Sequence, residues 1–189
     1  DGTCEDDRGD REWVGALVEH EARLEPVDPA VRRNSRHDFE RLVARGMRPS
    51  LLTNGIKATR ELLQRLAGAG LVDVAFHVDT TQQRAACLSE EALNPVRCEY
   101  IERARGLPIG VFFNTTVHAG NLAEVAMLAA FFRAHADVVR FASFQLQADT
   151  GRGVWGSREA TVTADRIAHE LQRGIGAWLH FNTLLAGHH

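Results

Sequence analysis

Polar and ionisable side chains recur directly after four short apolar runs of this 189-residue sequence. Such side chains donate and accept hydrogen bonds, and imidazole and carboxylate groups also exchange protons, so they suit ligand binding and acid–base chemistry. One polar strand end is ordinary turn chemistry, whereas four together predict one shared site. The side chains are Thr53 and Asn54, then His77 and Asp79, then Asn114, Thr115, Thr116 and His118, and finally Gln145.

The histidines among these residues allow a second interpretation. If His77, Asp79 and His118 gather around one divalent ion, the site is that of a metal-dependent hydrolase or isomerase, because imidazole and carboxylate ligands suit zinc or manganese. The sequence has no H-x-H pair to support this reading. Taken alone, His77 is expected to be a hydrogen-bonded core histidine, and His118 a turn histidine.

The elements that must position these side chains alternate along the chain. Apolar runs predict strands, and segments of helical period follow each of them. This alternation predicts an α/β fold with a parallel sheet. The sheet is expected either to be open and doubly wound or to form all or part of a β/α barrel. The expected strands lie at 49–55, 71–79, 107–114 and 137–145, and the expected helices at 56–70, 89–106, 121–136 and 163–176.

The first part of the chain interrupts this alternation. Residues 11–24 are predicted to form an amphipathic helix and residues 36–46 a second helix, with no strand between them. The sequence therefore divides into an N-terminal helical segment at 1–36, a core at 37–175 and a tail at 176–189 that has room for one short strand. At the start of one core helix, Asn121 and Glu124 have the spacing of a capping box.

Charge and hydropathy exclude several classes of partner. The net charge is −3 and no Lys/Arg cluster is interleaved with aromatic residues, so a nucleic acid is not expected. No apolar run approaches the ~20 residues that cross a bilayer, and the acidic start "DGTCEDDRGD" differs from a signal peptide. These features predict a cytoplasmic protein. A small-molecule substrate is expected instead from the shared polar site at the strand ends.

Four stretches of the sequence resemble one enzyme family. "GMRPSLLTNGI", "VDVAFHVDTT", "VFFNTTVHAGN" and "VRFASFQLQADTGRG" are similar to the middle and later part of radical S-adenosylmethionine enzymes. The resemblance is strongest to the branch of tetraether-lipid synthases and pterin-methylating homologues, and weaker to the molybdenum-cofactor cyclase. It covers roughly residues 37–153 and rests on four strand ends with their spacing.

This resemblance implies a fold, two cofactors and a reaction. The family uses a partial β/α barrel to hold S-adenosylmethionine and a [4Fe–4S] cluster, which a flavodoxin or ferredoxin reduces. An electron from the cluster splits the sulfonium, and the resulting deoxyadenosyl radical removes a hydrogen atom from the substrate. The radical chemistry belongs to the cofactors, and the protein binds and orients them.

Roles in binding the cofactor follow from the same resemblance. It implies that Thr53 and Asn54 lie beside S-adenosylmethionine and that Asp79 accepts hydrogen bonds from the ribose hydroxyls. It also implies that Asn121 lies near the methionine moiety and that Gln145 flanks the adenine or the substrate.

Further residues are implied to face the substrate. Asn114, Thr115 and Thr116 would line the floor of the pocket between cofactor and substrate, with His118 beyond the strand. The "TGR" stretch resembles a loop that closes over the site, with Arg152 as an anion contact.

The cysteines depart from the pattern of the family, which binds its cluster through a C-x-x-x-C-x-x-C loop. Cys4, Cys87 and Cys98 do not have this spacing, and the "GGE" segment of the family is also absent. The sequence therefore predicts that a piece is missing between about residues 20 and 37, which leaves the barrel incomplete at its N-terminal end. The remaining alternative is a relative that has lost the cluster and binds a small molecule.

Overall fold

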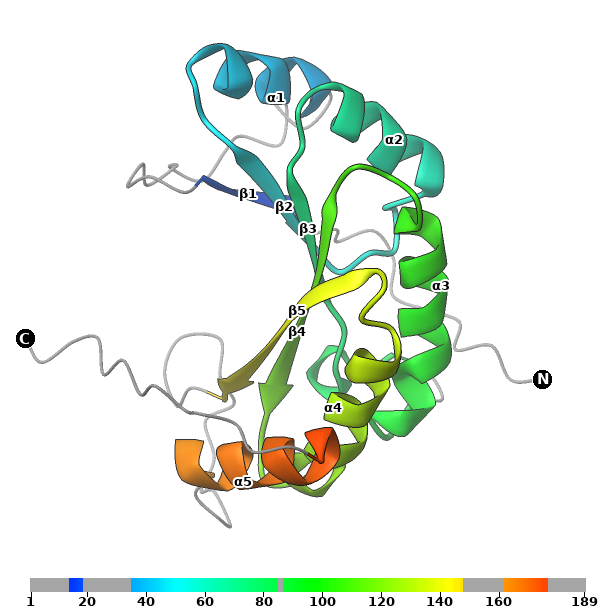
Figure 1. Cartoon of the computed structure of the whole chain (residues 1–189), viewed down its shortest axis with the longest axis vertical. Helices are drawn as coiled ribbons and strands as arrows, with labels where there is room; N and C mark the ends of the chain where they lie inside the picture. Colours follow the sequence, from blue (N-terminus) through cyan, green and yellow to red (C-terminus); the bar gives the residue numbers. More distant parts are fainter. Residues whose placement is uncertain (1–13, 19–34, 85–86, 148–161, 177–189) are drawn as a thin grey trace, which may run out of the picture.

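A five-stranded sheet forms the centre of the computed structural model, which describes residues 14–18, 35–84, 87–147 and 162–176 (Figure 1). The strands follow one another in chain order across the sheet. β2 to β5 are parallel, and β1 pairs with β2 in the antiparallel direction. The strands are β1 Val14–Val18, β2 Pro49–Thr53, β3 Asp73–His77, β4 Gly110–Val117 and β5 Val139–Leu146.

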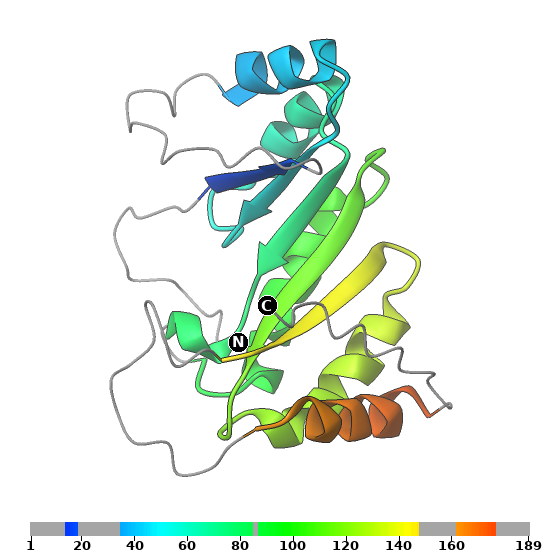
Figure 2. The same cartoon turned by 90° about the vertical axis from the view of Figure 1, so that its left-hand side faces the viewer.

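Helices α1 to α4 cover one face of this sheet, and Figure 2 shows the other face turned toward the viewer. α5 packs against α4 beyond the carboxyl end of the sheet. Within the described ranges, no helix is both long and apolar enough to cross a membrane. The α-helices are α1 Ser35–Ala44, α2 Arg60–Gly68, α3 Asn94–Ala104, α4 Val125–Ala134 and α5 Ala164–Ile175, and the 3₁₀ turns are η2 Thr80–Gln82, η3 Glu91–Leu93 and η4 Leu122–Glu124.

The order of the parallel strands confirms the predicted α/β class. β2 to β5 are adjacent in chain order, so the described sheet has no point at which the strand order reverses. A doubly wound sheet has such a point. The sheet is not closed, since β1 and β5 are its two edges. The structure thus establishes a parallel α/β sheet with helices on one face, and it does not establish a barrel.

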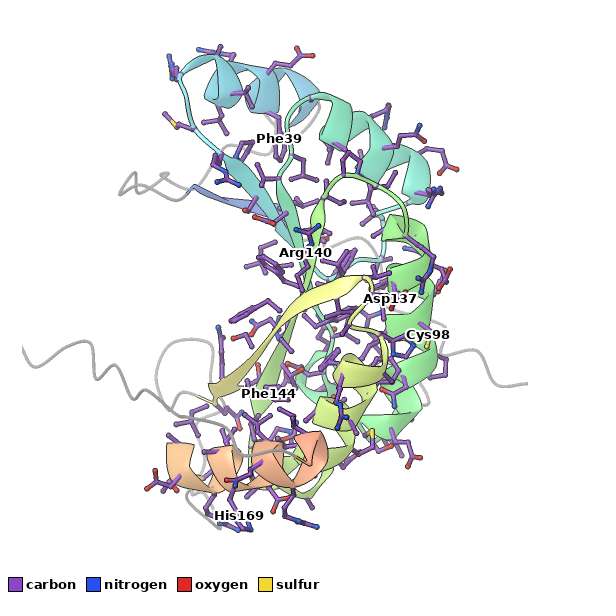
Figure 3. All side chains as sticks on the ribbon, viewed as in Figure 1. Phe39, Cys98, Asp137, Arg140, Phe144 and His169 are labelled. Atoms are coloured by element: carbon purple, nitrogen blue, oxygen red, sulfur yellow. The ribbon has the colours of Figure 1, made fainter. Side chains whose placement is uncertain are left out.

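The hydrophobic core lies between the sheet and helices α1 to α4. Strand side chains alternate between the two faces, so every second residue of β3 and β4 is buried against the helices. Phe113 of β4 stacks on Phe132 of α4 with ring centroids 5.2 Å apart. Phe39 of α1 and Phe144 of β5 also contact this interface (Figure 3). Each large buried side chain contributes about 1.5–3 kcal/mol of transfer free energy.

The prediction of a first helix near the N-terminus is wrong for the five residues of that segment that the structure describes. Residues 11–24 were expected to be helical, but Val14–Val18 forms β1 and pairs along its length with β2. The run VGALV contains no polar residue, so its pattern cannot distinguish a helix from a strand, and the available backbone of β2 decides. The second predicted helix, at 36–46, is confirmed as α1.

The helix predicted at 89–106 starts later than expected. α3 begins at Asn94, and Pro95 lies in its first turn, where a missing backbone N–H costs no hydrogen bond. The residues before it form η3 instead. Pro95 therefore lies at the start of the helix.

A buried ion pair attaches α3 to the carboxyl end of β3. Arg97 and Glu90 are both 0% exposed, and the guanidinium of Arg97 donates to the carboxylate of Glu90. Arg97 also donates to the carbonyl oxygen of Val78 at 2.9 Å and to that of Glu90 at 2.6 Å. Burial lowers the pKa of Arg97, while Glu90 opposes this change. The pair thus fixes the chain just beyond β3.

Replacing one member of this pair should destabilise the fold strongly. We expect Arg97→Met to lower the free energy of unfolding by about 3–5 kcal/mol, because it leaves the buried carboxylate of Glu90 without its cation. Urea unfolding followed by far-ultraviolet circular dichroism measures the change. Arg65→Met on the exposed face of α2 is the matched control, with an expected change within about 0.5 kcal/mol. Equal losses in the two variants would contradict the structural role of Arg97.

Candidate functional site

We call the face of β2 to β5 opposite to helices α1 to α4 the open face. Register brings the polar residues of three strands into rows on this face: His77 lies beside Asn114, Asn114 beside Ser143, and Thr116 beside Gln145. An apolar row lies nearer the amino ends of the strands. The open face carries Ser50, Leu52, Asp73, Ala75, His77, Phe112, Asn114, Thr116, Phe141, Ser143 and Gln145.

Asp79 joins the ends of β3 and β4. Its Oδ2 atom lies 2.7 Å from Nε2 of His77 and accepts a hydrogen bond of 2.7 Å from the backbone N–H of Thr116. Its Oδ1 atom accepts from the backbone N–H of Thr81 at 3.0 Å and from the hydroxyl of the same residue. Asp79 is 0% exposed. All four lone-pair positions of this carboxylate therefore have donors within the chain.

The charge of Asp79 is stabilised by these donors. Burial alone raises the pKa of this carboxyl group, but the hydrogen bond and the electrostatic interaction with His77, with the donors from Thr81 and Thr116, outweigh it and hold the pKa at about 2. Asp79 is therefore an anion throughout the neutral and mildly acidic range. Contact of Asp79 with a ribose stays a prediction, and in this arrangement it would require one internal donor to leave.

Glu90 forms a second buried centre next to the first. Its Oε1 atom accepts from the backbone N–H of Thr80 at 3.0 Å, from the Thr80 hydroxyl at 2.9 Å and from the side-chain amide of Asn121 at 2.8 Å. The Thr80 hydroxyl also lies 3.1 Å from Nε2 of His118. Glu90 thus links the turn after β3 to the turn after β4.

Asn121 does not form the predicted capping box. It precedes η4, but its side chain makes no capping hydrogen bond to that turn. Its Oδ1 atom accepts from the backbone N–H of His118 at 2.8 Å, and its amide donates to the carbonyl oxygen of Thr116 at 2.9 Å as well as to Glu90. Asn121 is 2% exposed. Its amide is already bonded to the nearby carboxylate and carbonyl oxygen, and its Oδ1 atom to the backbone of His118, so the side chain does not cap the helix. Contact with the methionine moiety stays a prediction.

Thr53 and Asn54 form a tight turn after β2. The hydroxyl of Thr53 accepts from the backbone N–H of Gly55 at 3.1 Å, and Oδ1 of Asn54 accepts from that of Ile56 at 3.2 Å. Gly55 has φ +83°, and a Cβ there would lie 2.1 Å from Cε2 of Tyr100. The turn therefore requires glycine for its conformation and for its packing on α3.

Two polar side chains of the predicted site remain directed to the open face. The amide of Asn114 donates to Oε1 of Gln145 at 3.3 Å. Oδ1 of Asn114 is buried and has no hydrogen-bond partner among the described residues, although a buried amide oxygen normally has one. Gln145 is exposed. These two residues provide an acceptor and a donor for a polar ligand.

The residues of the metal interpretation do not form one centre. His77 is paired with Asp79, whereas Nδ1 of His118 accepts from the backbone N–H of Gly120 at 3.1 Å and Nε2 faces Thr80. In the described parts of the chain, no group of three or more His, Cys, Asp or Glu side chains is arranged to hold a metal ion. The structure brings His77 and Asp79 together and gives His118 separate partners.

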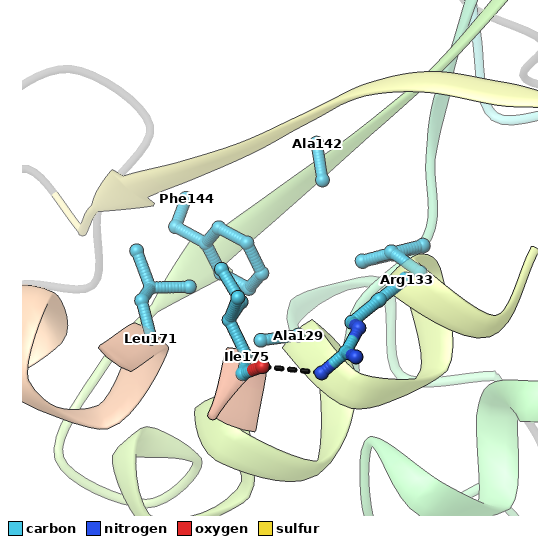
Figure 4. A pocket seen from close by; sticks show the side chains of 7 residues that line it. Ala129, Arg133, Ala142, Phe144, Leu171 and Ile175 are labelled. Carbon is cyan, nitrogen blue, oxygen red and sulfur yellow. Dashed lines mark hydrogen bonds between the residues drawn. The ribbon is translucent and has the colours of Figure 1, made fainter. Parts of the chain in front are cut away.

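A separate apolar pocket lies on the helix side of the sheet. It has a volume of about 320 Å³ and is lined by residues of α4, α5 and β5, including Phe144 and Leu171 (Figure 4). A charged side chain at its wall, Arg133, donates to the backbone carbonyl oxygen of Ile175. The polar groups of the open face do not line it.

The predicted site residues lie along the carboxyl edge of one sheet, with the exception of Arg152, which falls outside the described residues. Thr53, Asp79, Thr115 and Asn121 are buried there, while Asn114, Thr116 and Gln145 face the open side. The predicted place of Thr115 on the pocket floor is wrong, because alternate residues of β4 point to opposite faces and Thr115 points to the helices. Glu90 and Arg97 give no signal in the sequence, because buried charged residues near a helix start have the same pattern as an exposed helix face. The chain matches no protein-family model, and no curated protein sequence matches it.

Stability should depend on pH through Asp79. Its pKa is lower in the folded chain, about 2, than the ordinary 3.8, so its contribution is complete above about pH 4 and is lost as the pH falls toward 2. We expect Asp79→Asn to lower the free energy of unfolding by about 2 kcal/mol near neutral pH, with the difference from the unmodified chain shrinking in acid.

Urea unfolding at several pH values measures this difference. Asp165→Asn, on the exposed first turn of α5, is the control and should show a small difference of at most about 1 kcal/mol. A difference for Asp79→Asn that stays constant from neutral pH to acid would contradict the assignment.

Proposed function

We propose that this chain is the S-adenosylmethionine-binding core of a radical S-adenosylmethionine enzyme, with β2 to β5 as part of a β/α barrel. The observation that carries the proposal is the row of polar side chains that register assembles on the open face at the carboxyl ends of β3, β4 and β5. Ligands of parallel α/β sheets bind at this edge. Sequential strands with helices on one face are what a partial barrel requires.

In this proposal, the residues divide into those that contact the cofactor and those that hold them in place. Asn114, Thr116 and Gln145 contact the nucleoside, because amide and hydroxyl groups match the donors and acceptors of adenine and ribose. The unpartnered Oδ1 atom of Asn114 is the acceptor that a ligand donor would satisfy. Asp79 and Asn121 act behind them by fixing the strand ends.

The two implied cofactors fit the described residues differently. The polar row suits S-adenosylmethionine, whereas the described residues offer no group of His, Cys, Asp or Glu side chains for a metal centre. In the family, the [4Fe–4S] cluster supplies the electron that splits the sulfonium. The proposed task of this chain's own residues is to bind and orient the nucleoside beside a small-molecule substrate.

The cysteine arrangement favours a second candidate. Cys4, Cys87 and Cys98 lack the spacing of the cluster loop, which is typical of a relative that retains ligand binding without radical chemistry. Anaerobic reconstitution with iron and sulfide separates the two candidates. A brown protein with iron–sulfur absorbance supports the radical enzyme, and a colourless protein that binds S-adenosylmethionine supports the binding domain.

Substitutions on the open face should weaken cofactor binding. We expect Asn114→Ala and Gln145→Ala each to raise the Kd for S-adenosylmethionine by about 2- to 10-fold, because each removes about one hydrogen bond worth 0.5–1.5 kcal/mol. Isothermal titration calorimetry measures the Kd.

Gln64→Ala, on the exposed face of α2, is the matched control and should leave the Kd unchanged. The proposal fails if the unmodified chain does not bind S-adenosylmethionine, or if all three variants bind it equally well.

A further inference from the structure

The pairing of His77 with Asp79 has a consequence for the second ring nitrogen of His77. A carboxylate only accepts hydrogen bonds, so the 2.7 Å contact with Asp79 requires the proton of the neutral imidazole to sit on Nε2. Nδ1 then carries the lone pair. Among the described residues, no group donates a hydrogen bond to this nitrogen of His77, and the side chain is 35% exposed on the open face.

The surroundings of the pair hold this arrangement in place. Asp79 cannot turn away from His77, because Thr81 and the backbone N–H of Thr116 hold its two oxygen atoms. The hydroxyl of Thr116 lies 3.3 Å from Nε2 of His77, on the same side of the ring. A buried carboxylate that orients an imidazole in this way also stabilises the imidazolium that forms when the ring takes up a proton.

The charged groups on the face of His77 set the electrostatic surroundings of its ring. Asp79 is the charged group in contact with the ring, and it is an anion. The next acidic residue on the same face of β3 is Asp73, at the amino end of the strand, where it accepts from the Ser50 hydroxyl. The neighbours on the parallel strands β4 and β5 are uncharged: Asn114, Thr116, Ser143 and Gln145.

We propose that His77 is a proton acceptor for a hydroxyl- or ammonium-bearing ligand bound on the open face, with Asp79 as its positioning residue. The O–H or N–H bond of the ligand breaks, its electron pair stays on the oxygen or nitrogen, and a new N–H bond forms at Nδ1. The imidazolium is balanced by Asp79 and later releases the proton to solvent. The inference rests on the proposed function only for placing the ligand on this face.

His118 provides an internal contrast to His77. Both of its ring nitrogens have partners, the backbone N–H of Gly120 at Nδ1 and the Thr80 hydroxyl at Nε2. His169 is an exposed histidine of α5 that lies away from the sheet (Figure 3). The three histidines therefore differ in whether a ring nitrogen is available and whether a carboxylate activates it.

Two measurements on the unliganded chain test the inference. The first is the imidazole ¹⁵N spectrum of the unmodified protein, in which His77 is expected to be protonated on Nε2 and unprotonated on Nδ1. The second is the rate of carbethoxylation by diethyl pyrocarbonate near neutral pH, read by peptide mass spectrometry. We expect His77 to react at least as fast as His169, and His118 to react more slowly than both.

The effect of Asp79 is tested by the same reaction in Asp79→Asn. Loss of the anion removes the acceptor that fixes the proton on Nε2 of His77, so the proton can move to Nδ1 and carbethoxylation there should slow by roughly 3-fold or more, while His169 keeps its rate. An unchanged rate at His77 in the folded variant would overturn the inference. A proton on Nδ1 of His77, or protection of His77 from the reagent, in the unmodified chain would also overturn it. Neither measurement uses S-adenosylmethionine, so a failure here is distinct from a failure of cofactor binding.

Discussion

Two buried carboxylates, Asp79 and Glu90, hold the carboxyl ends of β3 and β4 in one arrangement. A buried carboxylate is tolerated only when donors surround it, and here the donors are backbone N–H groups and side chains of the turns that follow the two strands. Arg97 adds the cation that Glu90 requires and joins α3 to the same edge. The geometry of the turns is thus fixed by the hydrogen bonds and the ion pair that the two buried carboxylates require, rather than by apolar packing.

The two faces of the sheet have different roles: one contributes to stability and the other offers groups for a ligand. The face covered by α1 to α4 carries the apolar core, and the buried carboxylates complete it at the strand ends. The open face carries an apolar row and a polar row, where His77, Asn114 and Gln145 retain groups for a ligand. Rigid strand ends position such groups without the entropy cost of ordering a loop.

Much of the fold could be predicted from the sequence because its strands and helices have clear hydrophobic periods. The four parallel strands and α1, α2, α4 and α5 lie close to their expected positions. The error at β1 has a physical cause, since a five-residue apolar run has no period, and pairing with the edge of β2 decides its conformation. Closure of the sheet also depends on contacts that no local pattern encodes.

For the candidate site, the order of amino acids specifies which residue types follow each strand and, through the parallel arrangement, that they share one edge. Which of them face a ligand depends on contacts formed in the folded chain. Asp79 and Asn121 turn inward, where donors and acceptors of the neighbouring turns satisfy them, and His77 faces outward because alternate residues of β3 point to the open face. Those partners come from Thr116 and Glu90, which are distant along the chain, so strand spacing alone could not reveal them.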